Sequence, residues 1–205
     1  MKKIDDTLVP ETLPRQGPAW LANLAAWVFA KRGWTATGDM VDAPKAILAV
    51  APHTSNWDFF IGLFALFALR LKVSFFGKHT LFVPPLGWLM RKFGGIPVER
   101  SRAHGVVEGI SQSIARQDSM LLALAPEGTR KGIYPWKTGF LHIARLANIP
   151  VQLIGLDYNH KRLVFGPVLS QIDDVDEQMQ KIYAFYANVA GKYSENCFTS
   201  EFPRE

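Results

Sequence analysis

The sequence predicts a single α/β domain in which a mostly parallel central sheet is flanked by helices. Two short apolar runs, residues 46–51 and 120–125, have the length and continuity of buried strands. Around them, segments with helical spacing alternate with further strand-like runs, an order that is typical of parallel sheets. The chain has 205 residues, of which 48% are hydrophobic, and this suits one domain with a real core.

Two segments precede the main domain. Residues 1–18 carry three spaced prolines and are expected to form an irregular arm. Residues 19–44 contain an amphipathic helix over 20–32, because apolar side chains recur there at spacings of three and four residues. Gly33 is a suitable stop for this helix. The main domain is expected over residues 45–205.

Inside the main domain, the same two periodicities define the elements. Continuous apolar runs between turn residues indicate strands, and longer stretches with one apolar face indicate helices. Strands are expected over residues 46–51, 73–76, 96–98, 120–125, 151–156 and 163–165. Helices are expected over residues 59–71, 86–93, 106–117, 138–147 and 175–193.

Charge and cysteine content limit the classes of function. The net charge is +5, but residues 1–172 carry +9 and residues 173–205 carry −4. The basic part suits nucleic acid, an anionic lipid or a phosphorylated small molecule. Cys197 is the only cysteine, which excludes a disulfide-stapled module and fits a reducing compartment such as the cytosol. The longest apolar run, Phe59 to Leu69, has 11 residues, whereas a membrane span needs roughly 20, so no spanning helix is expected.

The loop after the 46–51 strand is the first candidate site, because ligands of parallel sheets bind beyond the carboxyl ends of the strands. It contains His53 and Asp58, five positions apart. Neither a helix nor a strand brings such a pair together, so only a turn would unite them. In one interpretation they form a base dyad, in which Asp58 holds one ring nitrogen and the other accepts a proton. In the other, Asp58 complements the dipole of the following helix and His53 ends the strand.

Two further loops at strand ends are basic. The first contains Arg100, whose planar guanidinium can grip a phosphate with two hydrogen bonds. The second, residues 126–132, contains Gly128, Thr129 and Arg130. Glycines let the backbone approach a ligand, and successive amides in such a turn can bind an anion. Taken singly, the first loop is more typical of a solvated basic loop, and the second of a tight turn.

Two lysines follow or open predicted elements, and two common catalytic motifs are missing. Lys78 follows the 73–76 strand, and Lys137 opens a helix whose N-terminus favours anions, although single exposed lysines usually serve solubility. The sequence has no Gly-x-Ser-x-Gly elbow of a serine hydrolase and no Cys/His cluster with zinc-ligand spacing. We therefore expect neither a serine nucleophile nor a metal site.

Four sequence blocks occur in a fixed order. They are His53-x4-Asp58, Gly95-Ile96-Pro97-Val98-Glu99-Arg100, Pro126-Glu127-Gly128-Thr129-Arg130 and Ile149-Pro150-Val151. In this combination the chain resembles the glycerolipid acyltransferase superfamily, which contains the 1-acyl-glycerol-3-phosphate acyltransferases. The resemblance covers residues 45–157, whereas residues 1–44 and 158–205 match only loosely.

The resemblance implies a glycerol-3-phosphate acyltransferase-like fold and transfer of a fatty acyl chain to a hydroxyl of a lysophospholipid such as 1-acyl-glycerol-3-phosphate. It implies that His53 and Asp58 are catalytic, with the histidine as general base. It assigns substrate binding to Lys78, Arg100, Glu127, Gly128, Thr129, Arg130 and Lys137. The donor is an acyl thioester, acyl-CoA or acyl carrier protein, which is already activated, so no cofactor is expected.

Other readings stay open. Water in place of the acceptor would make the enzyme a thioesterase or hydrolase, and the acceptor can also be glycerol 3-phosphate or an amino-acid-based lyso-lipid. We expect a cytoplasmic protein that associates peripherally with an anionic membrane. Trp20, Trp27 and Phe29, followed by Lys31 and Arg32, suit such an interface, although an ordinary core helix fits the same pattern. Nucleic acid is not expected, because basic and aromatic residues are not interleaved in a stripe.

Overall fold

The computed structural model describes residues 1–98 and 106–198, in which strands and helices alternate along the sequence. The strands are β1 (Thr35–Thr37), β2 (Lys45–Ala51), β3 (Val73–Lys78), β4 (Gly95–Val98), β5 (Met120–Leu124), β6 (Val151–Asp157) and β7 (Arg162–Leu169). The α-helices are α1 (Ala19–Lys31), α2 (Trp57–Ala68), α3 (Leu86–Lys92), α4 (Val106–Ala115), α5 (Gly139–Ala147) and α6 (Val175–Tyr186). Short 3-10 helices are η1 (Asp6–Leu8), η2 (His79–Phe82) and η3 (Ser194–Asn196).

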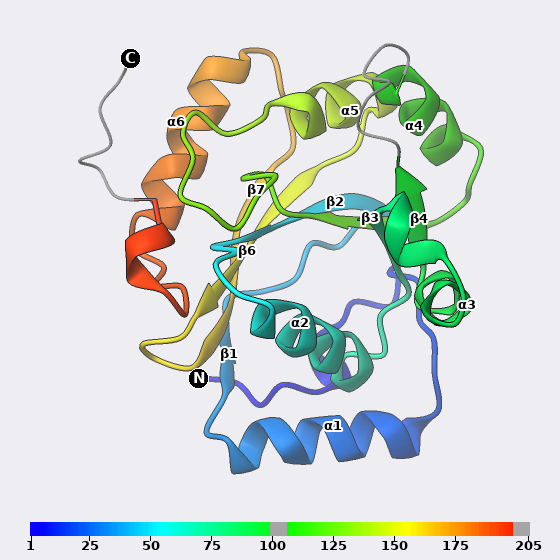
Figure 1. The fold of residues 1–205 in the computed structure, drawn as a ribbon, viewed down its shortest axis with the longest axis vertical. Helices are drawn as coiled ribbons and strands as arrows, with labels where there is room; N and C mark the ends of the chain where they lie inside the picture. Colours follow the sequence, from blue (N-terminus) through cyan, green and yellow to red (C-terminus); the bar gives the residue numbers. More distant parts are fainter. Residues whose placement is uncertain (99–105, 199–205) are drawn as a thin grey trace.

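The strands form one sheet in the order β1-β7-β6-β2-β5-β3-β4 (Figure 1). β2 is parallel to both of its neighbours, β5 and β6, and β3 is parallel to β5 and β4. β7 runs antiparallel to β6, and β1 is parallel to β7. The sheet is therefore mostly parallel, and the predicted α/β class is confirmed.

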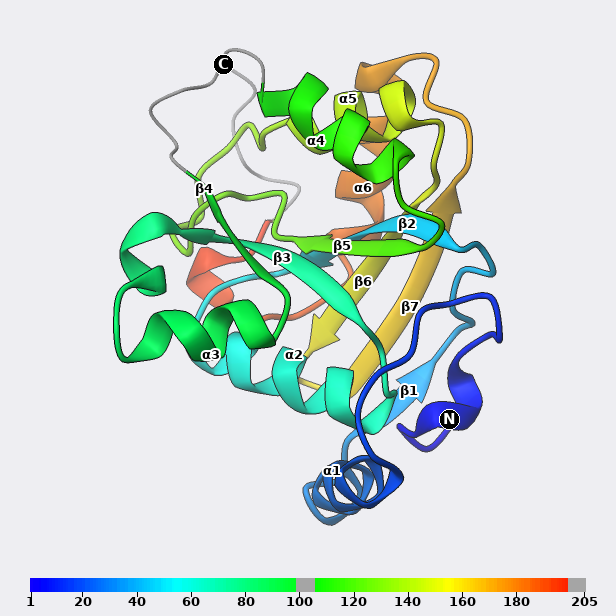
Figure 2. The ribbon, with the colours of Figure 1, turned by 90° about the vertical axis from the view of Figure 1, so that its right-hand side faces the viewer.

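Helices cover both faces of the sheet, as the side chains of β2 illustrate. Ala46 and Leu48 point into the core that α1 and α2 cover, whereas Ile47 and Ala49 point into the core beneath α4, α5 and α6. Figure 2 shows these two helical layers on opposite sides of the sheet. Because β2 is packed on both faces, its continuous apolar sequence is what a central parallel strand requires.

Parallel strands place their carboxyl ends at a common edge. Because β2 pairs with β5, the loops that follow Ala51 and Leu124 leave the sheet side by side. β6 pairs with β2 on its other side, so the connection after Asp157 starts at the same edge. This edge of the sheet is where the candidate loops lie.

Most predicted elements end within three residues of the observed ones, but three differ in ways that matter here. α2 begins at Trp57 rather than at residue 59. The helix predicted over 175–193 was too long, since α6 ends at Tyr186 and the chain then turns so that the carbonyl of Ala190 accepts the N–H of Tyr158 at 2.8 Å. β1 was missed because it has only three residues and gains its partners from β7.

The N-terminal segments are built into the core. In the arm, Ile4, Val9 and Leu13 are buried in the core that α1 and α2 cover. For Phe29 of α1 the sequence left a membrane interface and the core both open, and the side chain is 3% exposed, with its ring 6.2 Å from that of Trp34. No helix in residues 1–98 and 106–198 combines the length and the apolar character that a membrane crossing requires.

Candidate active site

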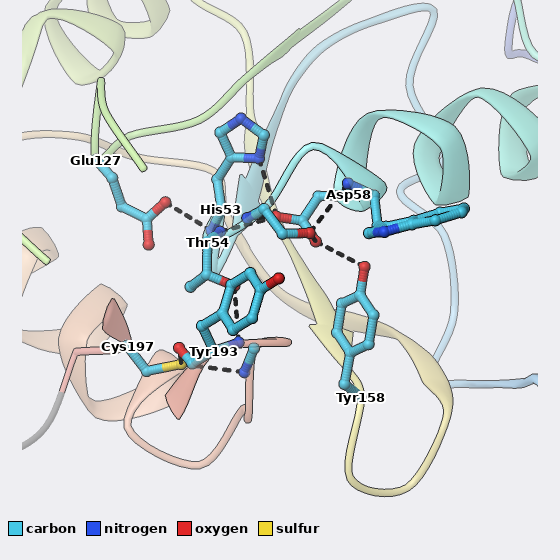
Figure 3. Close-up of polar contacts among 10 residues, drawn as sticks. His53, Thr54, Asp58, Glu127, Tyr158, Tyr193 and Cys197 are labelled. Atoms are coloured by element: carbon cyan, nitrogen blue, oxygen red, sulfur yellow. Dashed lines mark hydrogen bonds and ion pairs between the residues drawn. The ribbon is translucent and has the colours of Figure 1, made fainter. Parts of the chain in front are cut away.

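A turn between β2 and α2 brings His53 and Asp58 together. The Asp58 carboxylate folds back over this turn, and its Oδ2 accepts the backbone N–H groups of Thr54 at 2.8 Å and Ser55 at 2.7 Å. The same Oδ2 lies 3.2 Å from Nδ1 of His53 (Figure 3). The turn that the spacing required is therefore held by the carboxylate itself. Ser55 Oγ accepts the N–H of Trp57 at 3.0 Å and satisfies a free donor of the first turn of α2.

The surroundings of Asp58 keep its carboxylate ionised. The residue is only 4% exposed, and burial alone would raise its pKa. Hydrogen bonds with His53, Tyr158 and the N–H of Ser55 outweigh this burial and hold the pKa of Asp58 below its usual value. A carboxylate next to Nδ1 favours the tautomer with the proton on Nδ1, which leaves Nε2 able to accept a proton.

The second oxygen of Asp58 is bound from a distant part of the chain. Oδ1 accepts the hydroxyl of Tyr158 at 2.6 Å and that of Ser55 at 3.3 Å. Tyr158 directly follows β6. Burial, then the hydrogen bond to Asp58 and its negative charge, raise the pKa of Tyr158 far above its usual value, so the phenol stays protonated and donates.

Glu127 reaches the same turn from the end of β5. Its Oε2 accepts the backbone N–H of His53 at 2.7 Å. Glu127 is 8% exposed and lines a small cavity of about 10 Å³ together with Ile133 and Trp136. Burial raises the pKa of Glu127 from 4.5 to about 8, while the His53 N–H lowers it and the charge of Asp58 raises it. Glu127 therefore holds the main chain of His53 from inside the fold.

The loop after Glu127 turns sharply at Gly128. The φ of Gly128 is +65°, a conformation that side chains rarely adopt. The aliphatic part of Lys137 packs over this position, since a Cβ on Gly128 would lie 3.4 Å from Cδ of Lys137. The N–H of Lys137 also donates to the carbonyl of Pro126 at 3.3 Å. Lys137 and the third sequence block are therefore brought together.

The remaining predicted substrate-binding residues differ in how they are placed. Thr129 is half-buried, and its hydroxyl accepts the N–H of Lys131 at 3.3 Å, whereas Arg130 is exposed. The backbone of Lys78 ends β3, and its side chain lies outside the described part of the structure. Arg100 lies in residues 99–105, which are also outside it.

The segment after α6 packs against the other side of the His53 turn. Gly191 approaches so closely that a Cβ there would lie 2.9 Å from Cγ2 of Thr54. The N–H of Tyr193 donates to Oγ1 of Thr54 at 3.2 Å, and the N–H of Gly191 donates to Sγ of Cys197 at 3.1 Å. Figure 3 shows Tyr193 and Cys197 on the side of Thr54 that faces away from the His53 ring.

The site is suited to acid–base chemistry on a hydroxyl group. It combines an imidazole of intermediate exposure, a buried ionised carboxylate and a phenol that donates to that carboxylate. Within residues 1–98 and 106–198, no three His, Cys, Asp or Glu side chains are grouped so that they could hold a metal ion.

Comparisons with known proteins identify the family of this chain. The family model described as Acyltransferase matches residues 19–156, which is more than half of the chain. The chain belongs to this acyltransferase family.

Three curated relatives carry the same name, and each matches about half of this chain. The 1-acyl-sn-glycerol-3-phosphate acyltransferase of Haemophilus influenzae is 28% identical over 113 residues, covering 50% of this chain and 47% of that protein. The protein of the same name from Escherichia coli is 29% identical over 111 residues, covering 47% and 45%. The one from Saccharomyces cerevisiae is 29% identical over 117 residues, covering 53% and 38%. The match spans less than half the length of each of these relatives.

A solved structure supports the fold. The 1-acyl-sn-glycerophosphate (LPA) acyltransferase PlsC from Thermotoga maritima matches with a TM-score of 0.56 and 15% sequence identity, over 80% of this chain and 75% of that one. At this identity the likeness establishes that this acyltransferase shares the fold of PlsC.

Two parts of the candidate site lie beyond residue 156, where the acyltransferase family match ends. They are Tyr158 and the segment 187–198, and the sequence reasoning missed both. One signal could have found Tyr158, because it directly follows a predicted parallel strand, where ligand-facing residues gather. No comparable signal marks the segment 187–198, which was expected to be partly helical.

Proposed function

We propose that this acyltransferase moves a fatty acyl chain from acyl-CoA or acyl carrier protein to the free hydroxyl of a lysophospholipid such as 1-acyl-glycerol-3-phosphate. The names of its curated relatives support this acceptor. The observation that carries the proposal is the 3.2 Å contact between His53 Nδ1 and buried Asp58, at the carboxyl ends of neighbouring parallel strands. This contact supports a general base, which the difficult step, removal of the proton from the acceptor hydroxyl, requires.

In the proposed reaction His53 is the general base. Its Nε2 removes the hydroxyl proton as the oxygen attacks the carbonyl carbon of the thioester. When the carbon–sulfur bond breaks, the imidazolium returns that proton to the leaving sulfur, so the products are an ester and a free thiol. Asp58 stays ionised and stabilises the imidazolium between these steps. Base catalysis of this kind contributes about 10²- to 10⁴-fold.

The acceptor also carries a phosphate, which calls for cations near the base. We assign substrate binding to Lys78, Arg100, Glu127, Gly128, Thr129, Arg130 and Lys137. The exposure of Arg130 and the packing of Lys137 over Gly128 support a cationic role for this loop. Glu127 takes part indirectly, because it holds the main chain of His53. The proposal involves no metal ion and no cofactor.

Replacing His53 tests the mechanism. For His53→Ala, kcat is expected to fall by about 10²- to 10⁴-fold, with a circular dichroism spectrum and Tm close to those of the parent protein. The measurement is the rate of thiol release in the presence of acceptor. A folded variant with the parent kcat would show that the imidazole is not the base.

Product analysis tests the substrate. Acyl-CoA and acyl carrier protein donors are offered with 1-acyl-glycerol-3-phosphate, glycerol 3-phosphate and an amino-acid-based lyso-lipid, and the products are identified by mass spectrometry. We expect the main product to be phosphatidic acid, which forms when 1-acyl-glycerol-3-phosphate receives a second acyl chain. Free fatty acid as the main product, with or without acceptor, would identify a thioesterase instead.

We also propose that the protein binds peripherally to an anionic membrane. Four of its six tryptophans are more than half exposed, namely Trp20, Trp27, Trp57 and Trp88. Three of these rings have a lysine Nζ within 6 Å of their centres, from Lys31, Lys92 and Lys192. Exposed tryptophans beside cations favour the interface of an anionic bilayer. Trp57 directly precedes Asp58, so one of these exposed rings lies next to the catalytic turn.

Vesicle binding tests the membrane proposal. The double variant Trp20→Ala/Trp27→Ala is expected to bind vesicles of phosphatidylcholine and phosphatidylglycerol about tenfold more weakly or worse, because two large interfacial side chains are lost. Leu146→Ala is the matched control, since Leu146 is 57% exposed on α5, on the opposite side of the sheet. Equal binding by the double variant, the control and the parent protein in a sedimentation assay would contradict the proposal.

A further inference from the structure

The two oxygens of Asp58 have different tasks. Oδ2 accepts two backbone N–H groups and faces His53, whereas Oδ1 depends on side-chain hydroxyls. Of these, the hydroxyl of Tyr158 at 2.6 Å is the short, strong donor, and that of Ser55 at 3.3 Å is a weak one. The carboxylate is therefore clamped at both ends, and one clamp comes from outside the family match.

From this arrangement we infer that Tyr158 is a positioning residue for catalysis, which fixes the rotation of the Asp58 carboxylate and so the orientation and tautomer of His53. The inference rests on the proposed role of His53 as general base. It extends the site beyond the four sequence blocks, to a residue 100 positions after Asp58.

Tyr158 is itself held firmly, as a positioning residue must be. Its backbone N–H donates to the carbonyl of Ala190 at 2.8 Å, which ties it to the segment after α6. Its ring meets the ring of Trp34 edge to face, with 5.4 Å between centres. Trp34 is 7% exposed and belongs to the core. The phenol therefore reaches Asp58 from a rigid support (Figure 3).

Loss of this hydroxyl has a defined consequence. Without it, Oδ1 of a buried carboxylate retains only the weak Ser55 contact, and the carboxylate can rotate about its Cβ–Cγ bond. Rotation moves Oδ2 away from Nδ1 of His53 and weakens the preference for the proton on Nδ1. Fewer molecules then present a bare Nε2 in the reactive orientation, which lowers kcat. Acceptor binding is unaffected, because no phosphate-binding group has changed.

The direct test is Tyr158→Phe, which keeps the ring against Trp34 and removes the hydroxyl. The expected result is a kcat about 10- to 100-fold lower, the size of effect that small misplacements of catalytic groups produce. KM for the acceptor should stay within about twofold. Incorporation of 4-aminophenylalanine at position 158 restores an N–H donor in the same place and should recover most of the lost kcat.

Tyr186→Phe is the matched control. Tyr186 is fully buried, and its hydroxyl donates to the carbonyl of Ala49 at 2.5 Å, away from Asp58. This variant should lose at least as much thermal stability as Tyr158→Phe but keep kcat within about twofold. If the two variants lose kcat in proportion to their stability, Tyr158 is structural only, and the inference is wrong.

A spectroscopic measurement separates this inference from the proposed reaction. In ¹⁵N-histidine-labelled protein, His53→Ala identifies the imidazole signals of His53. The parent protein should show one protonated and one bare ring nitrogen, and Tyr158→Phe should bring the two shifts closer together. If no donor–acceptor pair supports turnover but the shifts still respond, the proposed function fails and the positioning role survives. Active enzyme with unchanged shifts and unchanged kcat in Tyr158→Phe would overturn the inference alone.

Discussion

Two regions of the molecule meet at Asp58, and they differ in what they contribute. The two sequence blocks that follow β2 and β5 provide His53, Asp58 and Glu127, the groups that the proposed mechanism uses. Residues from Asp157 onward, in the connection between β6 and β7 and in the segment 187–198, lie beyond the four blocks and beyond the family match, yet Tyr158 binds Asp58 from there. We infer that the blocks carry the reacting groups of the proposed mechanism, whereas the groups that orient them can come from a neighbouring strand.

The largest expected loss of kcat comes from replacing Asp58, which lies in the first sequence block. Asp58→Asn keeps the size of the side chain but removes the charge that stabilises the imidazolium of His53. It also turns one of the two acceptor oxygens into a donor, which conflicts with the hydroxyl of Tyr158 or with the N–H groups of Thr54 and Ser55. We expect kcat to fall by about 10²- to 10⁴-fold with little change in the acceptor KM. Steady-state kinetics with varied acceptor measure both constants.

An equally buried aspartate in the second region provides the control. Asp157 is 1% exposed and accepts Nε and Nη2 of Arg162 at 3.2 and 2.7 Å. Asp157→Asn removes the charge from this pair and should lower Tm, because Arg162 loses its partner, but it should cost far less kcat than Asp58→Asn. Equal losses of kcat in the two variants would show that the division between reacting and holding regions is wrong.

Glu127 belongs to the third sequence block, and its carboxyl group supports the main chain of His53. The pKa of its carboxyl is about 8 in the folded protein, against a usual value of 4.5. The folded state therefore binds the proton more tightly than the unfolded state does. This contribution to stability is fully present below pH 4.5 and is lost as pH rises through about 8. The raised pKa limits the loss to at most about 5 kcal/mol.

Glu127→Gln removes this titration and keeps an oxygen that can accept the His53 N–H. The free energy of unfolding of the parent protein should decline from pH 5 to pH 9 more steeply than that of the variant, since all other groups titrate alike in both. Urea unfolding at several pH values measures the difference. Parallel pH profiles would mean that Glu127 is ionised in the folded state, and a carboxylate that binds substrate would then fit better.

The sequence was sufficient for the fold class, but the residues alone left open whether a turn joins His53 to Asp58. The apolar runs of β2 and β5 are continuous because both strands are buried on two faces, and that pattern is visible locally. The five-residue spacing showed that only a turn could unite the pair, and it did not decide between a dyad and two unconnected side chains. These features depend on residues that are close in the chain.

The contacts that the sequence could not reveal join residues that are far apart. Tyr158 reaches Asp58 only because β6 lies next to β2, and the strand order is not written in any local pattern. Gly191 reaches Thr54 only because the chain leaves α6 at Tyr186, where the helical pattern alone predicts a longer helix. In both cases the decisive partner is supplied by tertiary packing.

The smallest expected effect tests whether the second region contributes any chemistry of its own. Cys197 lies on the far side of Thr54 from the His53 ring (Figure 3), and acyl transfer from a thioester can in principle proceed through a cysteine. Burial raises the pKa of its thiol, and a thiol rather than a thiolate is a poor nucleophile. Cys197→Ala should therefore keep kcat within about twofold of the parent value.

The same variant also distinguishes a structural role of Cys197 from a catalytic one. Sγ of Cys197 accepts the N–H of Gly191 at 3.1 Å and donates to the carbonyl of Tyr193 at 3.4 Å, so alanine leaves both groups without this partner and Tm should drop. Cys197→Ser restores a donor and acceptor and should recover part of that drop. A Cys197→Ala protein that is folded but inactive, with an acylated cysteine detectable by mass spectrometry in the parent enzyme, would assign the nucleophile to the second region. A lower Tm with an unchanged kcat would show that Cys197 only supports the packing of this segment, because the loss of a nucleophile would stop turnover.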